Sequence, residues 1–382
     1  MNSKKLLWTR VCKFLALLLP AVLLVLLLPV NDFADTPRIQ GFYMEEKDSL
    51  DMVLIGSSEN YAGYSPVLAY EEFGFTSYPY VFSATDFSMF EEQVEEVLLV
   101  QSPEIIVVDI GEMHRANRSN KDTLFRQFMA AVPFSSHKID MIRQHGDPEQ
   151  ILSYWFPFFV NHGNMTPETV LNYMKLNGAI RKRGFTLLKG VVTFTGTGEN
   201  WDGPYVTPWR DTNGDDSAVA LSQEVLDTCR DVVAVCRKHP EVQFLFINTP
   251  HRISTDSAYL SYQTVNAMGA YLQAEGYEFV NLESMTDRLG IIPETDFYNN
   301  NHMNLYGQYK LTRYLGQKLT QEYGLKGREQ SPENRNNWDT CVEYQKRYFA
   351  LFEEKVAQHI PGEFGLWLQE DNWLLENLKE QQ

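Results

Sequence analysis

The sequence predicts an α/β protein built on a doubly wound parallel sheet. Short β-branched runs alternate along the chain with segments of helical period, and polar or turn-forming residues follow the runs. Continuous apolar strands are typical of parallel sheets that helices cover on both faces. With 382 residues, of which 44% are apolar, the chain is long enough to bury such a core.

Three of five expected strands lie in the first third of the chain. They span residues 51–55, 78–82 and 105–110, and the third run, Ile-Ile-Val-Val-Asp-Ile, is the strongest. A helix is expected from Met89 to Val100, because its apolar residues share one face and acids and amides occupy the other. Pro103 ends this helix before the third strand.

The alternation resumes only after residue 217. We expect a helix at 221–237, a strand at 242–247, a helix at 259–275, a weaker strand at 277–282 and a closing helix at 305–323. Five parallel strands with helical crossovers predict a flavodoxin-like sheet. In such sheets ligands bind outside the carboxyl ends of the strands, so the residues that follow each strand are the candidates for a site.

These elements divide the chain into five expected parts. The α/β domain is discontinuous, and the interruption is an insertion with helical pieces that either shapes a pocket or partner surface or covers the sheet as a cap. The parts are a basic flank with a membrane anchor (1–31), a juxtamembrane linker (32–49), the α/β domain (50–113 and 217–325), the insertion or cap (114–216) and a helical tail (326–382), helical from 338 to 359.

The first 31 residues differ in kind from the rest. Basic residues precede an uncharged apolar run over 14–30, and Asp32 and Asp35 follow it. This pattern predicts a single transmembrane helix with a cytoplasmic basic flank, which places the bulk of the chain outside the cell membrane. A cleaved signal peptide is the competing interpretation, but no small-x-small cleavage pattern follows the run, so we favour the anchor.

Charge and cysteine content exclude two classes of function. With 33 basic and 50 acidic residues the net charge is −17, and no basic stripe with interleaved aromatics is present, so nucleic-acid binding is disfavoured. The four cysteines form no Cys-x-x-Cys pair or His/Cys cluster, so we expect neither a structural metal nor a cofactor.

Ser58 is the candidate nucleophile. It follows the first strand in Gly56-Ser57-Ser58, where a sharp turn into a helix would raise its hydroxyl above the sheet, close to backbone amides that can stabilise an oxyanion. The alternative is a serine that only caps the helix.

His302 is the candidate base. It lies in the loop before the closing helix, from which it can return over the sheet edge to take a proton from Ser58. A solitary loop histidine is more often a surface residue. The chain order and strand position of the two residues together favour acyl transfer by a serine and a histidine.

At these positions the sequence resembles the SGNH or GDSL hydrolase superfamily. Gly56-Ser57-Ser58 is similar to the nucleophile block, and Asn299-Asn300-Asn301-His302 is similar to the last block, Asp-x-x-His. The resemblance covers roughly 50–325 without the insertion. The Gly-Ser-Ser-Glu form with an amino-terminal anchor resembles the DltD-like proteins of teichoic-acid D-alanylation and related polysaccharide O-acetylation proteins.

The resemblance implies an externally facing, membrane-anchored esterase or O-acyltransferase. Its implied substrate is a cell-surface polysaccharide or teichoic-acid-like polymer, and its implied partner is a membrane-bound O-acyltransferase. The alternative is a catalytically inactive binding or assembly subunit of a cell-envelope acylation machinery, because a fold does not settle function.

The sequence departs from the family pattern at the triad acid. This position falls on Asn299, whose amide can orient a histidine but cannot stabilise imidazolium by charge. Asp296 is the nearest carboxylate and the other candidate, and the residues alone do not decide between the two.

The second departure concerns the oxyanion hole. The resemblance places it at the backbone amides of Ala84 or Thr85 and after the third strand at Gly111, where no asparagine follows, and Asn248 is a further candidate after the fourth strand. Glu112 would oppose an oxyanion unless it holds Arg115 or a substrate hydroxyl.

Four basic residues follow the third and fourth strands: His114, Arg115, His251 and Arg252. They either bind an anionic group of a substrate or neutralise an acidic surface.

Overall fold

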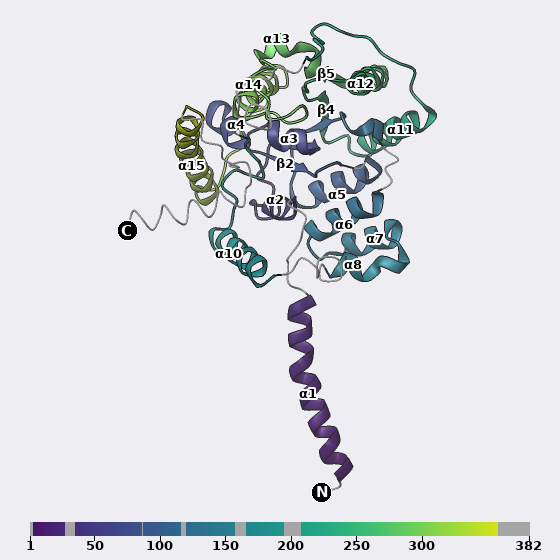
Figure 1. Ribbon diagram of the computed structural model, residues 1–382, viewed down its shortest axis with the longest axis vertical. Helices are drawn as coiled ribbons and strands as arrows, with labels where there is room; N and C mark the ends of the chain where they lie inside the picture. The colour runs from purple at the N-terminus through teal and green to yellow at the C-terminus, as the bar shows by residue number, and fades with distance from the viewer. Residues whose placement is uncertain are drawn as a thin grey trace.

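The protein has a five-stranded, all-parallel sheet in the order β2-β1-β3-β4-β5 (Figure 1). The computed structural model describes residues 3–26, 35–85, 87–115, 120–156, 166–194 and 208–357. The strands are β1 (Met52–Gly56), β2 (Ser77–Val81), β3 (Ile105–Asp109), β4 (Gln243–Asn248) and β5 (Glu278–Asn281). The predicted α/β class is confirmed, and this strand order is the flavodoxin-like one.

The strands are buried on both faces, as their continuous apolar sequence predicted. In β1, Val53 and Ile55 pack into one apolar cluster, whereas Met52 and Leu54 pack into a second cluster on the opposite face. The same alternation holds in β3 and β4, because neighbouring side chains of a strand point to opposite faces. Two helical layers therefore enclose the sheet.

The helices between the strands agree closely with the sequence prediction. The first layer includes α5 (Phe90–Val100), α11 (Gln223–Lys238) and α12 (Asp256–Ala274), and the second includes α3 (Ser58–Gly63), α4 (Pro66–Phe73) and α14 (Leu305–Gln321). The carboxyl ends of β1, β3 and β4 lead into the loops that carry the candidate site residues.

The described part of the predicted insertion is helical. It contains η2 (Met113–Arg115), α6 (Lys121–Ala131), α7 (Ser136–His145), η3 (Pro148–Gln150), α8 (Ile151–Trp155) and α10 (Pro167–Arg183). Phe128 and Met141 join the apolar cluster on the α5 side of the sheet, so α6 and α7 extend that layer. Residues 116–119, 157–165 and 195–207 of the predicted insertion lie outside the described residues.

The amino-terminal region forms two helices, α1 (Ser3–Leu26) and α2 (Asp35–Phe42). We predicted a membrane-spanning helix over the first 31 residues. Among the described residues, no helix combines the length and the hydropathy needed to cross a membrane, and residues 27–34 lie outside the description. The predicted linker contains α2, whose Ile39 and Phe42 are fully buried against the sheet, so this helix belongs to the body of the protein.

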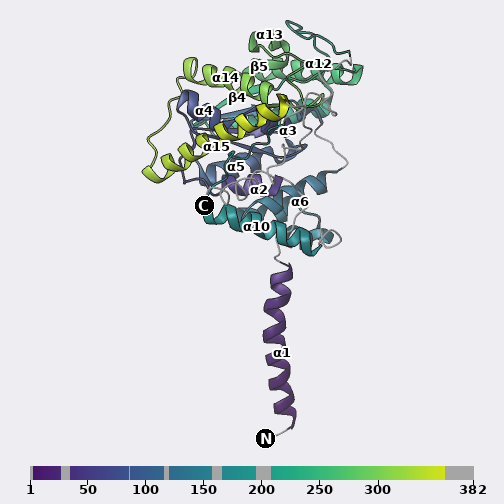
Figure 2. The ribbon, with the colours of Figure 1, turned by 60° about the vertical axis from the view of Figure 1, so that its left-hand side comes forward.

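The predicted carboxyl-terminal helix is confirmed, with an earlier start. Helix α15 (Pro332–Ala357) begins at Pro332 rather than at Trp338, and Pro is favoured in the first turn of a helix. It contacts α4 on the α14 side of the molecule (Figure 2), and Trp338 is fully buried. Residues 358–382 lie outside the described part of the chain.

Candidate active site

The turn after β1 presents Ser58 at the first position of α3. A Cβ at Gly56 would overlap Asn60 Oδ1, which accepts a hydrogen bond of 2.8 Å from the Ser57 amide, so glycine is required where the strand turns into the helix. Ser57 is buried, whereas Ser58 is half-buried. The local sequence therefore presents the second serine, and not the first, to the cleft.

The loop that carries His302 is held by its own backbone. The Tyr298 amide donates to the His302 carbonyl at 2.9 Å, and Phe297 and Met303 form an isolated antiparallel bridge. Asn304 then caps α14 by accepting from the amides of Tyr306 and Gly307. These bonds fix the histidine immediately before the closing helix, where the sequence placed it.

The loop after β4 also holds this histidine loop in place. The Arg252 amide donates to the Asn300 carbonyl at 2.8 Å, and its guanidinium Nη1 donates to Asn300 Oδ1 at 3.1 Å. Arg252 thus has a structural role between the two loops.

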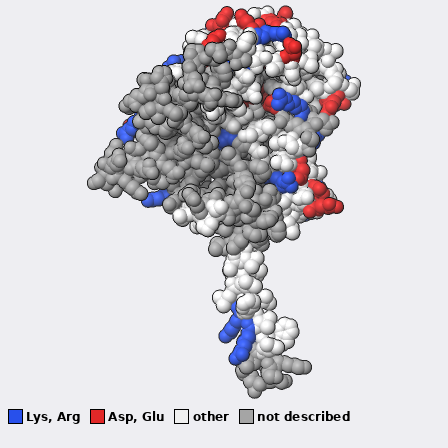
Figure 3. All heavy atoms as spheres, in the orientation of Figure 1, with Lys and Arg blue, Asp and Glu red and all other residues white. Residues whose placement is uncertain are grey.

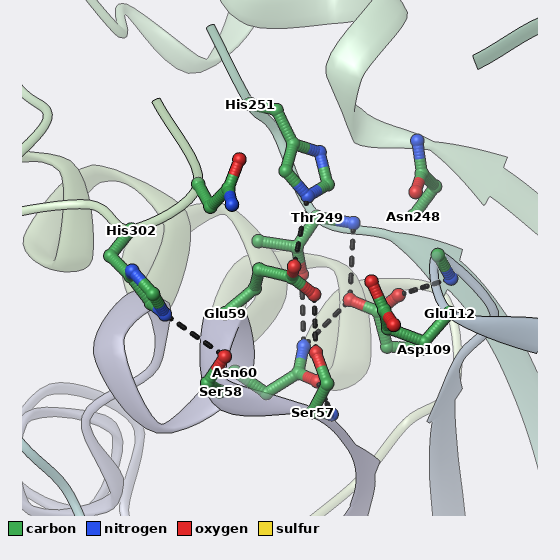
Figure 4. A network of polar contacts seen from close by, with 12 residues as sticks. Ser57, Ser58, Glu59, Asn60, Asp109, Glu112, Asn248, Thr249, His251 and His302 are labelled. Carbon is green, nitrogen blue, oxygen red and sulfur yellow. Dashed lines mark hydrogen bonds and ion pairs between the residues drawn. The ribbon is translucent and has the colours of Figure 1, made fainter. Parts of the chain in front are cut away.

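Ser58 and His302 meet at hydrogen-bond distance. Ser58 Oγ lies 2.9 Å from His302 Nε2 (Figure 4). His302 Nδ1 lies 3.0 Å from Asn299 Oδ1. The same amide oxygen accepts from the backbone N–H groups of Asn301 and His302, at 2.9 and 2.8 Å. These two donors fix the orientation of the Asn299 amide, so Nδ1 must donate to it, which leaves the Nε2 lone pair to accept the Ser58 proton.

Asp296 does not orient His302. Its carboxylate lies 2.5 Å from Lys310 Nζ, accepts from the Ile292 amide at 2.7 Å and accepts from the Thr295 hydroxyl at 3.0 Å. The choice that the sequence left open between Asn299 and Asp296 falls on Asn299, and Asp296 instead joins the loop to α14.

A second histidine lies beside the nucleophile, between two carboxylates. His251 Nε2 is 3.2 Å from Glu59 Oε1 (Figure 4). His251 Nδ1 is 3.5 Å from Glu283 Oε1. The Ser57 hydroxyl donates to Glu59, and Asn248 Nδ2 donates to Glu283 at 2.8 Å. We call Glu59, His251 and Glu283 the carboxylate–histidine cluster.

The two histidines have opposite electrostatic surroundings. Burial lowers the pKa of His302, and Glu59 only partly opposes this effect, so its imidazole is neutral near pH 7. Burial would also lower the pKa of His251, but the charges of Glu283 and Glu59 raise it well above its ordinary value. His251 is therefore a cation, whereas His302 is an available base.

Asp109 connects the ends of β1, β3 and β4. Its carboxylate accepts from Asn60 Nδ2 at 2.6 Å, from the Thr249 amide at 3.1 Å and from the Gly111 amide at 2.8 Å. Burial raises the pKa of this carboxyl group, and the nearby charge of Glu59 raises it further. The three bonds fix the turn that carries Ser58 relative to the two neighbouring loops.

The structure separates the four predicted oxyanion-hole residues into two groups. The Gly111 amide donates to Asp109, and Asn248 Nδ2 donates to Asn281 and Glu283, so both donors already have acceptors. Ala84 and Thr85 lie in a turn next to β1, because the Thr85 hydroxyl donates to the Gly56 carbonyl. Ala84 has a φ of 56°, which is a strained value for a residue other than glycine, and the amides of Ala84 and Thr85 both stay predicted donors.

A polar pocket of about 80 Å³ adjoins the turn that carries Ser58 and the loop that carries His302. Glu59, next to Ser58, and Asn301, next to His302, both line it. The four basic residues predicted to line the cleft also contribute to it, and Arg115 Nη1 lies 3.2 Å from Glu112 Oε1, so this glutamate does hold the arginine. The His114 imidazole lies 2.8 Å from the Gly111 carbonyl, and burial lowers its pKa to about 4.

The contacts of Glu59, Asp109 and Glu283 in the site were not predicted from the sequence. Each is a buried carboxylate at or just after the carboxyl end of a strand, and this position was the available signal. In the sequence, a carboxylate at the end of a strand looks like an ordinary loop acid, because its partners come from other strands.

Among the residues that the structure describes, no group of three or more histidine, cysteine, aspartate or glutamate side chains is arranged to hold a metal ion. Comparison with protein-family models matches no family, and comparison with curated proteins finds no match. The geometry of the site therefore carries the functional argument.

Proposed function

We propose that this chain is an SGNH-like serine esterase or O-acyltransferase. The observation that carries the proposal is the 2.9 Å contact between Ser58 Oγ and His302 Nε2, with Nδ1 held by Asn299 at 3.0 Å. A serine, a neutral histidine and a group that fixes the tautomer are the parts that nucleophilic acyl transfer requires. The flavodoxin-like strand order and the position of both loops support the resemblance to the SGNH superfamily.

In this mechanism Ser58 Oγ attacks an acyl carbonyl while its proton passes to His302 Nε2. In this proposal the backbone amide of Ala84 or Thr85 donates a hydrogen bond to the oxyanion of the tetrahedral intermediate. The intermediate collapses as His302 returns the proton to the leaving oxygen, which leaves the acyl group on Ser58. Water or a sugar hydroxyl then attacks this ester, with His302 again taking and returning a proton.

The catalytically inactive binding subunit is the second candidate. A binding role does not need a serine hydrogen-bonded to a histidine whose second nitrogen is fixed as a donor. The contacts of His302 therefore favour the enzyme over the binding subunit.

The cellular setting remains a proposal based on the sequence. Basic side chains are visible on α1, and both basic and acidic side chains are visible on the body of the protein (Figure 3). The basic residues of α1 agree with the proposed cytoplasmic flank. The cell-surface polymer and the membrane-bound O-acyltransferase partner rest on the resemblance alone. The polar pocket beside Ser58 is compatible with an acceptor that carries hydroxyl groups.

Labelling with a fluorophosphonate tests the catalytic proposal. This reagent reacts with activated serines, so the purified full-length chain is expected to be labelled at Ser58, and Ser58→Ala and His302→Ala are expected to lose the label. Ser102→Ala is the matched control, because Ser102 is exposed and its hydroxyl contacts Asp48 far from the cleft. Absence of label on a folded wild-type chain would contradict the proposal.

A further inference from the structure

The predicted triad lacks a charge that its chemistry needs. Proton transfer from Ser58 turns His302 into an imidazolium, and burial disfavours that cation. In a serine triad the third residue is a carboxylate that stabilises the imidazolium, but Asn299 is neutral and can only orient the ring. The nearest acid on the same loop, Asp296, is paired with Lys310.

We propose that the carboxylate–histidine cluster replaces the missing triad acid, with Glu59 stabilising the His302 imidazolium through space and with His251 and Glu283 as positioning residues. This inference rests on the proposed serine mechanism. It assigns functions to three buried residues that lie outside the Ser58–His302–Asn299 chain of hydrogen bonds.

The position of Glu59 supports this role. It follows Ser58 directly in the first turn of α3, it is buried, and its carboxylate is held by the Ser57 hydroxyl and by His251 at 3.2 Å. A rigid buried charge acts over a longer range than an exposed one, because water screens it less.

The protonation states agree with the same assignment. Burial alone would raise the pKa of Glu59, but the charge of His251 lowers it to about 2, so the carboxylate stays ionised. Glu59 in turn raises the pKa of His302, whereas the positive charge of His251 lowers it. Glu283 holds His251 from its other nitrogen and is itself held by Asn248.

Other charged or titratable groups near His302 are accounted for. The Tyr61 ring stacks against the His302 ring with a centroid distance of 6.3 Å. The Arg38 guanidinium lies 3.7 Å from the centroid of the Tyr61 ring. Arg252 contacts Asn300 on the same loop. Glu59 is the carboxylate whose charge raises the pKa of His302, and its own cationic partner is His251.

The test is an NMR titration of His302 in the full-length chain, which needs no substrate. Glu59→Gln is expected to lower the pKa of His302 below its wild-type value. Glu283→Gln is the matched control: it removes an equally buried carboxylate from the same cluster, but it weakens the positive charge of His251 and is not expected to lower the pKa of His302. A pKa lowered equally by both variants would indicate a structural effect and would overturn the proposal.

Kinetics with a chromogenic ester provide the second readout. Glu59→Gln is expected to reduce kcat on the order of tenfold, the effect of losing one partly screened unit charge. Adding Asn299→Asp to Glu59→Gln supplies a carboxylate at Nδ1 and is expected to restore most of kcat. Failure of this rescue in a folded double variant would overturn the proposal.

Two further outcomes concern a Glu59→Gln variant that does not fold and a Glu59→Gln variant that has no effect. If Glu59→Gln does not fold, Asn299→Asp alone is expected to increase kcat severalfold, and an unchanged kcat would show that charge beside His302 does not limit the reaction. If the wild-type chain hydrolyses the ester but Glu59→Gln leaves the pKa of His302 and kcat unchanged, this inference fails while the proposed function stands.

Discussion

The loop that carries His302 contacts Ser58, and the loop that carries His251 contacts the neighbouring Glu59, yet the two loops hold their histidines in opposite protonation states. His302 contacts a hydroxyl and a neutral amide, whereas His251 contacts two carboxylates. Burial lowers the pKa of the first, and the carboxylates raise the pKa of the second.

The pKa values of the two histidines differ because of the groups that each one contacts, and not because of burial or sequence position. A neutral imidazole with a fixed tautomer can accept a proton, whereas an imidazolium between two carboxylates can only hold charge in place. We therefore expect His302 to affect chiefly the reaction and His251 to affect chiefly the stability of the site.

The largest expected effects come from replacing each histidine with alanine. His302→Ala is expected to reduce ester hydrolysis by about 10⁴-fold or more, with little change in stability, because it removes the base.

His251→Ala leaves Glu59 and Glu283 buried without their cation and is expected to lower the free energy of unfolding by about 3 kcal/mol. Urea denaturation and steady-state kinetics on both variants measure the two effects, and the reverse pattern would contradict the assignment.

The pH dependence sharpens the same contrast. Because the pKa of folded His302 is lowered, its base form persists to lower pH, so the acid limb of kcat/KM is expected below pH 6.5. The pKa of folded His251 is raised, so its stabilisation is fully present below its unfolded pKa of about 6.5 and is lost as the pH rises through the folded value.

Urea denaturation across this range checks the stability prediction. The free energy of unfolding is expected to fall on the alkaline side in the wild type, and His251→Ala is expected to lack this fall. An acid limb of kcat/KM above pH 7 would contradict the assignment of His302 as the base, because the pKa of His302 is lowered.

Most of the fold and the two central residues could be predicted from the sequence. The apolar runs that became β1, β3 and β4 are continuous because helices cover both faces, so local pattern was sufficient. Ser58 and His302 follow from their positions after the first strand and before the closing helix. The contact between them required only that both loops lie at the same edge of the sheet.

The supporting residues could not be predicted, because their roles depend on contacts between distant segments. Asn299 and Asp296 look equivalent along the chain, and only the Lys310 contact from α14 separates them. Glu59 and Glu283 lie far apart in sequence and come together through His251. Asn248 resembled an oxyanion donor until its amide was found to hold Glu283.

Trapping of an acyl-enzyme tests the central claim most directly. The full-length chain is mixed with p-nitrophenyl acetate, quenched in acid during the first turnover and digested for mass spectrometry. The account predicts an acetyl group on the peptide that contains Ser58, assigned by fragmentation to Ser58 and not Ser57, and its absence in His302→Ala. An active wild-type chain that never carries the acetyl group on Ser58 would contradict it.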